Sequence, residues 1–193
     1  MQQVKKKCRN KGKIRNSQMA LVLSGRKNRA QFILLEKRRK RWRIKMQCPA
    51  YIGKNGMGKQ YEGDGKTPVG LYHLTEAFGR KKNPGTVLAY TRLTPYHYWC
   101  TDVKSKAYNR MVKIPFKGKD RNFGEHLYQY KKQYRYALCI DYNKERVPGR
   151  GSAIFLHCVG KRKYTEGCVA ISSKNIKKLL KCVEGEIPIF FII

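Results

Sequence analysis

Two side chains that could perform covalent catalysis lie close together near the C-terminal end of the sequence. His157 closes the apolar run Ile-Phe-Leu-His, and Cys168 follows a glycine in Thr-Glu-Gly-Cys-Val-Ala, eleven residues later. An imidazole within hydrogen-bond reach of a thiol accepts its proton and makes the sulfur a nucleophile. The pair predicts Cys168 as nucleophile and His157 as general base. On spacing alone, an ordinary core cysteine beside an unrelated histidine is the more common explanation.

The residues between the pair predict how the thiol is tuned. Lys161, Arg162 and Lys163 are cationic, and their charges would favour the thiolate and lower the pKa of Cys168. Gly167 has no Cβ, which predicts room for an acyl substrate and for backbone N–H groups that hold an oxyanion. We expect the two flanking apolar runs to pair antiparallel as a hairpin, because that would bring their ends together.

Short apolar runs separated by turn residues predict a mainly β domain around this pair. Strands are expected at residues 18–23 and 31–36 as a hairpin, then at 41–46, 69–74, 136–142, 152–157 and 187–193. One amphipathic helix is expected after Ser172 or Ser173, with Gly185 ending it. Its apolar residues recur at helical spacing, as Ile176, Leu179, Leu180 and Val183. A weaker helix is expected at residues 125–132.

The composition excludes several classes of protein. The 193 residues carry 44 Lys and Arg against 12 Asp and Glu, a formal charge of +32, yet 41% are hydrophobic, so the chain can bury a core. Disorder throughout is excluded, and no apolar run approaches the length of a membrane span. Residues 1–17 are predicted to be a flexible basic arm before one domain, 18–193. The charge predicts a polyanionic partner: nucleic acid, anionic membrane or anionic cell-wall polymer.

Two further patterns bear on possible cofactors. The seven cysteines contain no C-x-x-C spacing, which argues against a zinc site. Glycines crowd residues 53–70 and predict a shaped loop, in which Asp64 between two glycines is more typical of a turn. Lys66 and Thr67 resemble the end of a phosphate-binding loop, but Pro68 follows at once, which argues against a nucleotide site.

Several segments, taken in order, resemble the L,D-transpeptidase catalytic domain family (YkuD-like) of bacterial cell-wall enzymes. They include Tyr-Glu-Gly-Asp-Gly-Lys-Thr-Pro-Val-Gly at 61–70, the run ending at His157, and Thr-Glu-Gly-Cys-Val at 165–169. The resemblance covers residues 51–193. The chain departs from the usual Ser/Thr-His-Gly-Cys motif, because Glu166 replaces the second histidine, and Ala170 replaces a terminal polar residue. The interval between His157 and Cys168 is also short.

The resemblance implies a β-sandwich-like domain and cysteine-dependent L,D-transpeptidation of peptidoglycan stem peptides. Cys168 would attack the carbonyl of the L-centred residue before a terminal D-alanine and form a thioester acyl-enzyme. His157, oriented by the main-chain carbonyl of Cys158, would accept the thiol proton and protonate the leaving D-alanine. An amine would resolve the acyl-enzyme, whereas water would make the protein an L,D-carboxypeptidase. This chemistry implies no metal and no organic cofactor. A carbapenem, a β-lactam, would be a covalent inhibitor.

The residues around the predicted nucleophile complete the candidate site. Gly167 belongs with Cys168 and His157 as part of the catalytic group. Glu166 is expected to face a cation such as Lys163, or a substrate ammonium, because a carboxylate beside a thiolate is unfavourable. The residues expected to bind substrate are Thr165, Glu166, Asp64, Lys66, Thr67 and Lys163.

The resemblance also bears on the setting of the protein. It implies an extracytoplasmic protein, in the cell wall or periplasm, whose leader has been removed; taken as complete, the sequence has no such leader and predicts a cytoplasmic protein. The basic surface would then adhere to an anionic wall polymer. Two alternatives stay open: a nucleic-acid-binding protein that uses the basic surface, and an inactive relative that only adheres to the wall.

Overall fold

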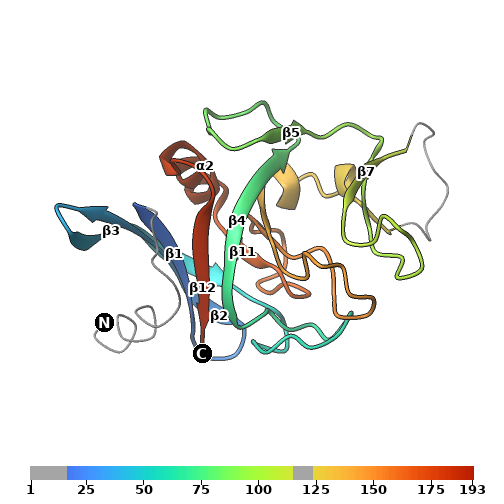
Figure 1. Ribbon diagram of the computed structural model, residues 1–193, viewed down its shortest axis with the longest axis horizontal. Coiled ribbons are helices and arrows are strands. Elements are labelled where there is room, and N and C mark those ends of the chain that lie inside the picture. Colours follow the sequence, from blue (N-terminus) through green and yellow to red (C-terminus); the bar gives the residue numbers. More distant parts are fainter. Residues whose placement is uncertain (1–16, 115–123) are drawn as a thin grey trace.

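The computed structural model describes residues 17–114 and 124–193. Apart from Ser17, the predicted basic arm at residues 1–17 lies outside the described residues. Figure 1 shows a large twisted sheet on one side of the molecule and a smaller strand and loop region around β7 on the other. Among the described residues, no helix has the length and apolar character needed to cross a bilayer.

Nine strands form the large sheet, which closes on itself. Their order is β12-β1-β2-β3-β11-β10-β9-β4-β5, and β12 also pairs with β4. The two halves of the sheet therefore face each other across an enclosed core, and the predicted mainly β fold is confirmed. The strands are β1 (Gln18–Ser24), β2 (Arg29–Arg38), β3 (Arg41–Tyr51), β4 (Gly70–Gly79), β5 (Tyr90–Arg92), β9 (Ala137–Ile140), β10 (Phe155–Cys158), β11 (Val169–Ile171) and β12 (Ile187–Ile192).

The N-terminal hairpin forms as predicted, because β1 and β2 pair antiparallel around the turn at Gly25. β3 is longer than expected and pairs with the whole of β2. The alternation at 41–46 predicted one buried apolar face, but only Met46 is buried; Trp42 is half-buried and Ile44 is 49% exposed. The reason is that the outer end of the β2–β3 hairpin extends beyond the rest of the sheet (Figure 1).

The predicted amphipathic helix is present as α2 (Ser173–Cys182). The Ser172 hydroxyl accepts a hydrogen bond from the Asn175 N–H at 3.2 Å and caps the first turn. Ile176, Leu179 and Leu180 are fully buried in the main core, while the lysines of the other face point to solvent. This packing fixes α2 against the sheet that carries His157 and Cys168.

A second, smaller sheet covers the face of β10 that carries Phe155. It consists of β6 (His97–Cys100), β7 (Met111–Lys113) and β8 (Gly124–His126), followed by the short 3₁₀ helices η1 (Leu127–Gln129) and η2 (Gln133–Arg135). The helix expected at 125–132 is therefore wrong: mixed tyrosines and lysines leave Leu127 as its one fully buried residue, too little for a helical apolar face. Trp99, Phe78 and Phe155 pack edge to face in a second core.

The two strands next to the candidate site, β10 and β11, are consecutive in the chain and pair in parallel. β10 and β11 pair with His157 opposite Ala170, so the antiparallel hairpin expected for this pair is wrong. The connecting loop first runs beside the end of β3, where Thr165 N–H donates to the Ile52 carbonyl and the Lys54 N–H donates to the Thr165 carbonyl. This detour returns the chain to the starting end of β10, and β11 enters the sheet between β10 and β3.

Candidate active site

The parallel pairing places His157 and Cys168 on one face of the sheet. Because Leu156 is level with Val169 and His157 with Ala170, Cys168 is level with Phe155, two residues before His157. Side chains alternate between faces along a strand, so positions 155, 157, 168 and 170 share a face. A rise of about 3.3 Å per residue and a strand spacing of about 4.8 Å put the two Cα atoms about 8 Å apart. Histidine and cysteine side chains can meet across that separation.

The Cys168 thiol is held by two backbone groups at the start of β10, one from Ala153 before the strand and one from Phe155, its first residue. The Phe155 N–H donates to Sγ at 3.2 Å, and Sγ lies 3.1 Å from the Ala153 carbonyl oxygen, to which it donates. Ala153 has a φ of +55°, a backbone conformation that costs energy in a residue with a Cβ. The half-buried thiol therefore has a fixed position beside a strained residue.

The environment of Cys168 opposes ionisation. Burial, and next the negative charge of Glu125, raise the pKa of the Cys168 thiol to about 12. The expected effect of residues 161–163 is not observed: their side chains are exposed, and water screens their charges. The positive charge that lowers the pKa of Cys168 is that of Lys59 instead. At neutral pH the resting site therefore contains a neutral thiol rather than a preformed thiolate.

His157 is suited to accept a proton from that thiol. It is 8% exposed, and burial lowers the pKa of its imidazole to about 4, so the ring is neutral near pH 7. Nδ1 lies 2.9 Å from the main-chain carbonyl oxygen of Cys158, which is the orienting contact that the family resemblance implied. Because the carbonyl can only accept, Nδ1 carries the hydrogen and Nε2 keeps its lone pair.

Two residues that the sequence did not point to, Tyr134 and Glu125, lie beside His157 and Phe155. The Tyr134 ring packs edge-on against His157 and Phe155, at centroid distances of 5.7 and 5.8 Å. Its hydroxyl donates to a carboxylate oxygen of Glu125 at 2.5 Å. Burial raises the pKa of Glu125 to about 7, although the hydrogen bond from Tyr134 opposes this. The sequence did contain a signal for Glu125, because an acidic residue near aromatic residues is unusual in so basic a chain.

Thr67 joins the glycine-rich loop to the segment that carries Cys168. Its fully buried hydroxyl accepts a hydrogen bond from the Gly53 N–H at 2.9 Å and donates to the Gly167 carbonyl at 2.8 Å. Gly53 is needed for this approach, because a Cβ there would lie 2.3 Å from the Gly65 carbonyl oxygen. Thr67 therefore positions the backbone beside Cys168, and its predicted contact with substrate stays a prediction.

Asp64 shapes the same loop. Its buried carboxylate accepts hydrogen bonds from the backbone N–H groups of Gln60 at 2.7 Å and Lys66 at 3.0 Å, and pairs with Lys59 Nζ at 2.9 Å. Although burial opposes ionisation, these donors and that of Tyr61 lower the pKa of Asp64. The carboxylate therefore shapes the loop through contacts within the protein, and the substrate contact expected of Asp64 stays a prediction. Lys66 contributes its backbone to this turn.

Thr165 and Gly167 fix the turn before Cys168. The Thr165 hydroxyl donates to the Cys168 carbonyl at 2.6 Å and accepts from the Gly167 N–H at 3.2 Å. Gly167 has a φ of +145°, and a Cβ there would lie 3.0 Å from the Lys66 carbonyl oxygen. The glycine is therefore required by the backbone conformation as well as by the space beside Cys168.

Glu166 is exposed and pairs with a different cation from the one expected. Its carboxylate lies 2.6 Å from Lys54 Nζ and 3.9 Å from the Arg162 guanidinium. Lys163 instead lies over the ring of Tyr51, at 5.6 Å from the centroid. Lys54 and Arg162 therefore hold the carboxylate of Glu166, which precedes Gly167, at the surface of the candidate site.

A cleft of about 440 Å³ lies close to this site. Trp99 and Asn109 are among its lining residues, and the Trp99 indole N–H donates to the Asn109 side-chain oxygen at 2.9 Å. The same oxygen accepts from the N–H of Ala153, the residue that holds the thiol, at 3.1 Å. The described ranges 17–114 and 124–193 contain no group of three or more His, Cys, Asp and Glu side chains suited to a metal ion.

The fold and this geometry define a closed β-sheet domain with a cysteine and a histidine on neighbouring strands. The L,D-transpeptidase catalytic domain (YkuD) family matches residues 22–189, and the chain belongs to that family. The match begins well before residue 51, where the motif resemblance starts. No curated protein matches the sequence.

Solved structures are similar to the chain at low identity. A variant of the helical cell shape determining protein Pgp2 from Campylobacter jejuni aligns with a TM-score of 0.50 and 21% identity, over 91% of this chain and 47% of that one. Bd1075 from Bdellovibrio bacteriovorus aligns with a TM-score of 0.47 and 20% identity, over 91% and 47% of the two chains. The chain thus spans about half the length of these structures, and the Pgp2 alignment supports the fold.

Proposed function

We propose that the protein is a cysteine-dependent L,D-transpeptidase that acts on peptidoglycan stem peptides. The observation that carries the proposal is the placement of Cys168 and His157 on one face of adjacent strands, with His157 Nδ1 held by the Cys158 carbonyl. This placement leaves Nε2 as the proton acceptor. Family membership over residues 22–189 supports the same assignment.

The first half-reaction forms a thioester at Cys168. As Sγ bonds to the carbonyl carbon of the L-centred residue, the thiol proton passes to His157 Nε2. The C–N bond to the terminal D-alanine then breaks, and the imidazolium gives its proton to the leaving amine. A neutral thiol and a neutral imidazole suit this concerted transfer, because neither group needs to be charged before substrate binds. We assign the Cys168 backbone N–H to the developing oxyanion.

The second half-reaction releases the acyl group. An acceptor amine attacks the thioester, His157 takes the proton that the amine loses, and the sulfur is returned to the thiol form. Attack by water would give L,D-carboxypeptidase activity instead. Glu166, exposed beside the site, is suited to a substrate ammonium, and Lys54 and Arg162 would compete with that ammonium for the carboxylate.

The charge of the protein supports a setting next to an anionic polymer. A formal charge of +32 fits adhesion to a cell wall that carries phosphate or carboxylate groups. The charge does not by itself select the cell wall, so the proposed setting outside the cytoplasmic membrane rests on family membership. Retention on purified cell walls is expected to weaken as salt rises to about 0.5 M, because salt screens the attraction. Undiminished retention in high salt would argue against an electrostatic origin.

Acylation by a carbapenem tests the proposal directly. We expect intact-mass spectrometry to show one covalent adduct on the wild type and on Cys158→Ala, and none on Cys168→Ala. Cys158 is the matched control, because it is a buried cysteine next to His157 on the same strand. Release of D-alanine from a stem tetrapeptide should follow the same pattern. Absence of both signals in the wild type, with tight salt-sensitive binding of an oligonucleotide, would support the nucleic-acid-binding alternative instead.

A further inference from the structure

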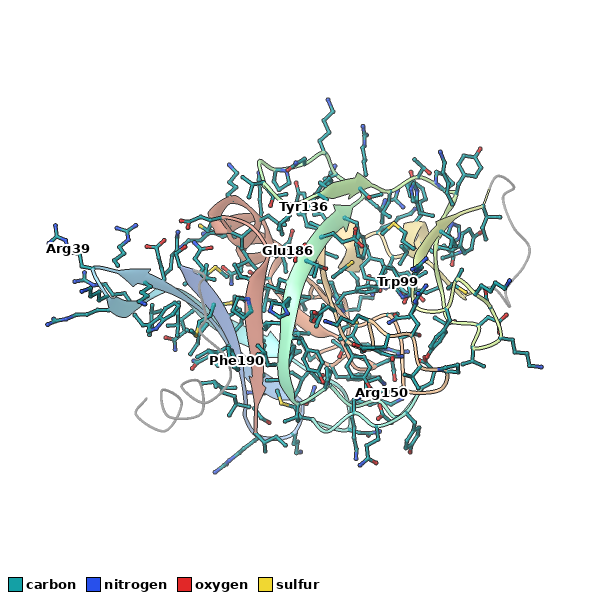
Figure 2. All side chains as sticks on the ribbon, viewed as in Figure 1. Arg39, Trp99, Tyr136, Arg150, Glu186 and Phe190 are labelled. Atoms are coloured by element: carbon teal, nitrogen blue, oxygen red, sulfur yellow. The ribbon has the colours of Figure 1, made fainter. Side chains whose placement is uncertain are left out.

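A pocket of about 540 Å³ lies on another part of the molecule and is lined by cations. It is formed by the segment after β4, by β5, by Tyr136 and by the exposed face of α2. Figure 2 places Tyr136 between α2 and β5. It shares no lining residue with the cleft near Cys168. We call it the basic pocket, after its six cations: Arg80, Lys81, Lys82, Arg92, Lys177 and Lys181.

The charges in the basic pocket are not balanced by nearby acids. None of the nine lining residues is Asp or Glu. Within residues 17–114 and 124–193, none of the six cations forms an ion pair with a carboxylate. Lys177 and Lys181 are also four residues apart on α2, a spacing at which like charges destabilise a helix. The protein therefore bears a repulsive cost here that a bound anion would remove.

The walls of the basic pocket are held in place before any ligand binds. The Arg80 guanidinium lies 3.7 Å from the centroid of the Tyr128 ring and donates to the Tyr128 carbonyl. The Tyr90 hydroxyl donates to the Lys81 carbonyl at 2.9 Å. The Asn83 side-chain oxygen accepts from two backbone N–H groups of the following turn, at 2.9 and 2.8 Å. Such preorganisation lowers the entropic cost of binding.

The number and arrangement of these groups indicate the chemistry of the ligand. Six cations exceed what one phosphate group needs, and the volume is that of a pocket for a small molecule or a short piece of a chain. Tyr136, the one aromatic lining residue, is 9% exposed, so it offers no surface on which a nucleobase could stack. We propose that the basic pocket binds a ligand that carries several phosphate groups along a chain, recognised through its phosphates alone.

The test uses the full chain and sodium tripolyphosphate as the probe, measured by isothermal titration calorimetry in 0.15 M salt. Lys177→Ala/Lys181→Ala removes two cations that line the basic pocket. Lys174→Ala/Lys178→Ala is the matched control, because it removes two exposed lysines of the same helix, at the same spacing, that do not line the pocket. We expect the pocket variant to weaken binding about tenfold or more and the control less than about threefold, since charge-assisted contacts are lost only in the former.

Further titrations with other phosphate compounds distinguish the kinds of ligand that the basic pocket could bind. Poly(glycerol phosphate) is expected to bind at least as tightly as tripolyphosphate per chain, and inorganic phosphate at least tenfold more weakly. Equal weakening of tripolyphosphate binding by the two double variants would overturn the proposal, because the net positive charge of the protein would then explain the binding without the basic pocket. Inorganic phosphate binding as tightly as tripolyphosphate, or oligodeoxythymidylate binding tenfold more tightly than poly(glycerol phosphate), would overturn it as well. Carbapenem acylation reports separately on Cys168, so the two proposals can fail independently.

Discussion

Thr67→Val should uncouple the glycine-rich loop from the segment that carries Cys168. The change keeps the shape of the fully buried side chain but removes the hydroxyl that joins the Gly53 N–H to the Gly167 carbonyl. Each buried group that loses its partner costs about 1–3 kcal/mol, so the free energy of unfolding should fall by about 2–6 kcal/mol. That is a large part of the total stability of a domain, which is typically about 5–15 kcal/mol.

Urea unfolding followed by circular dichroism measures this loss. Thr67→Ser is the matched control, because it keeps the hydroxyl and loses one buried methyl group, which costs about 1 kcal/mol. Carbapenem acylation of Cys168 should slow in Thr67→Val and stay near the wild-type rate in Thr67→Ser. A loss below about 1 kcal/mol in Thr67→Val, with an unchanged acylation rate, would refute the view that this hydroxyl joins the two segments.

Three further predictions concern the charges and backbone of the site. Because the pKa of Cys168 is raised to about 12, its alkylation by iodoacetamide should accelerate about tenfold per pH unit from pH 7 to 10. Mass spectrometry of the Cys168 peptide measures the rate, and a plateau near pH 7 would contradict the neutral thiol. Glu125→Gln removes the charge that helps to raise this pKa and should speed alkylation at pH 8, whereas an unchanged rate would leave Glu125 without influence on the thiol. Gly167→Ala should lower the unfolding free energy by about 1–2 kcal/mol or more, because φ there is +145°, and a melting temperature equal to that of the wild type would count against a required glycine.

The low pKa of His157 makes stability depend on pH. The unfolded chain takes up a proton below about pH 6.5, whereas the folded imidazole does so only near pH 4, so the unfolded state binds more protons in between. Stability should therefore fall by up to about 3 kcal/mol as the pH drops from 6.5 to 4. Glu125, whose pKa is raised to about 7, acts in the opposite direction over much of this range. Urea unfolding should show the loss clearly in Glu125→Gln, and a flat profile there would contradict the assignment.

Local patterns in the sequence predicted the elements that depend on nearby residues. The β1–β2 hairpin follows from two apolar runs around a turn, and α2 follows from its apolar spacing and its Ser172 cap. Both features depend on dihedral preferences and side-chain periods within about ten residues, which the order of amino acids records directly. The motifs at residues 61–70 and 165–169 likewise pointed to the family that the comparison confirmed.

Those local patterns could not predict contacts between segments that lie far apart in the sequence. The apolar runs ending at His157 and following Cys168 predicted two adjacent strands, but their parallel direction depends on the contact of Thr165 with Ile52, more than a hundred residues away. The pairing of Glu166 with Lys54 arises from the same approach. A strand period is the same for either direction, so only the path of the connecting loop could decide between them.

The sequence by itself therefore determined the mainly β class and the helix α2, and it predicted the cysteine and histidine pair on which the proposed function depends. The tertiary structure alone decided the electrostatic state of that pair, because the pKa of Cys168 depends on burial and on Glu125, which lies 43 positions earlier in the chain. Desolvation and charge act through space and fall off with distance in three dimensions, whereas sequence motifs record neighbours along the chain.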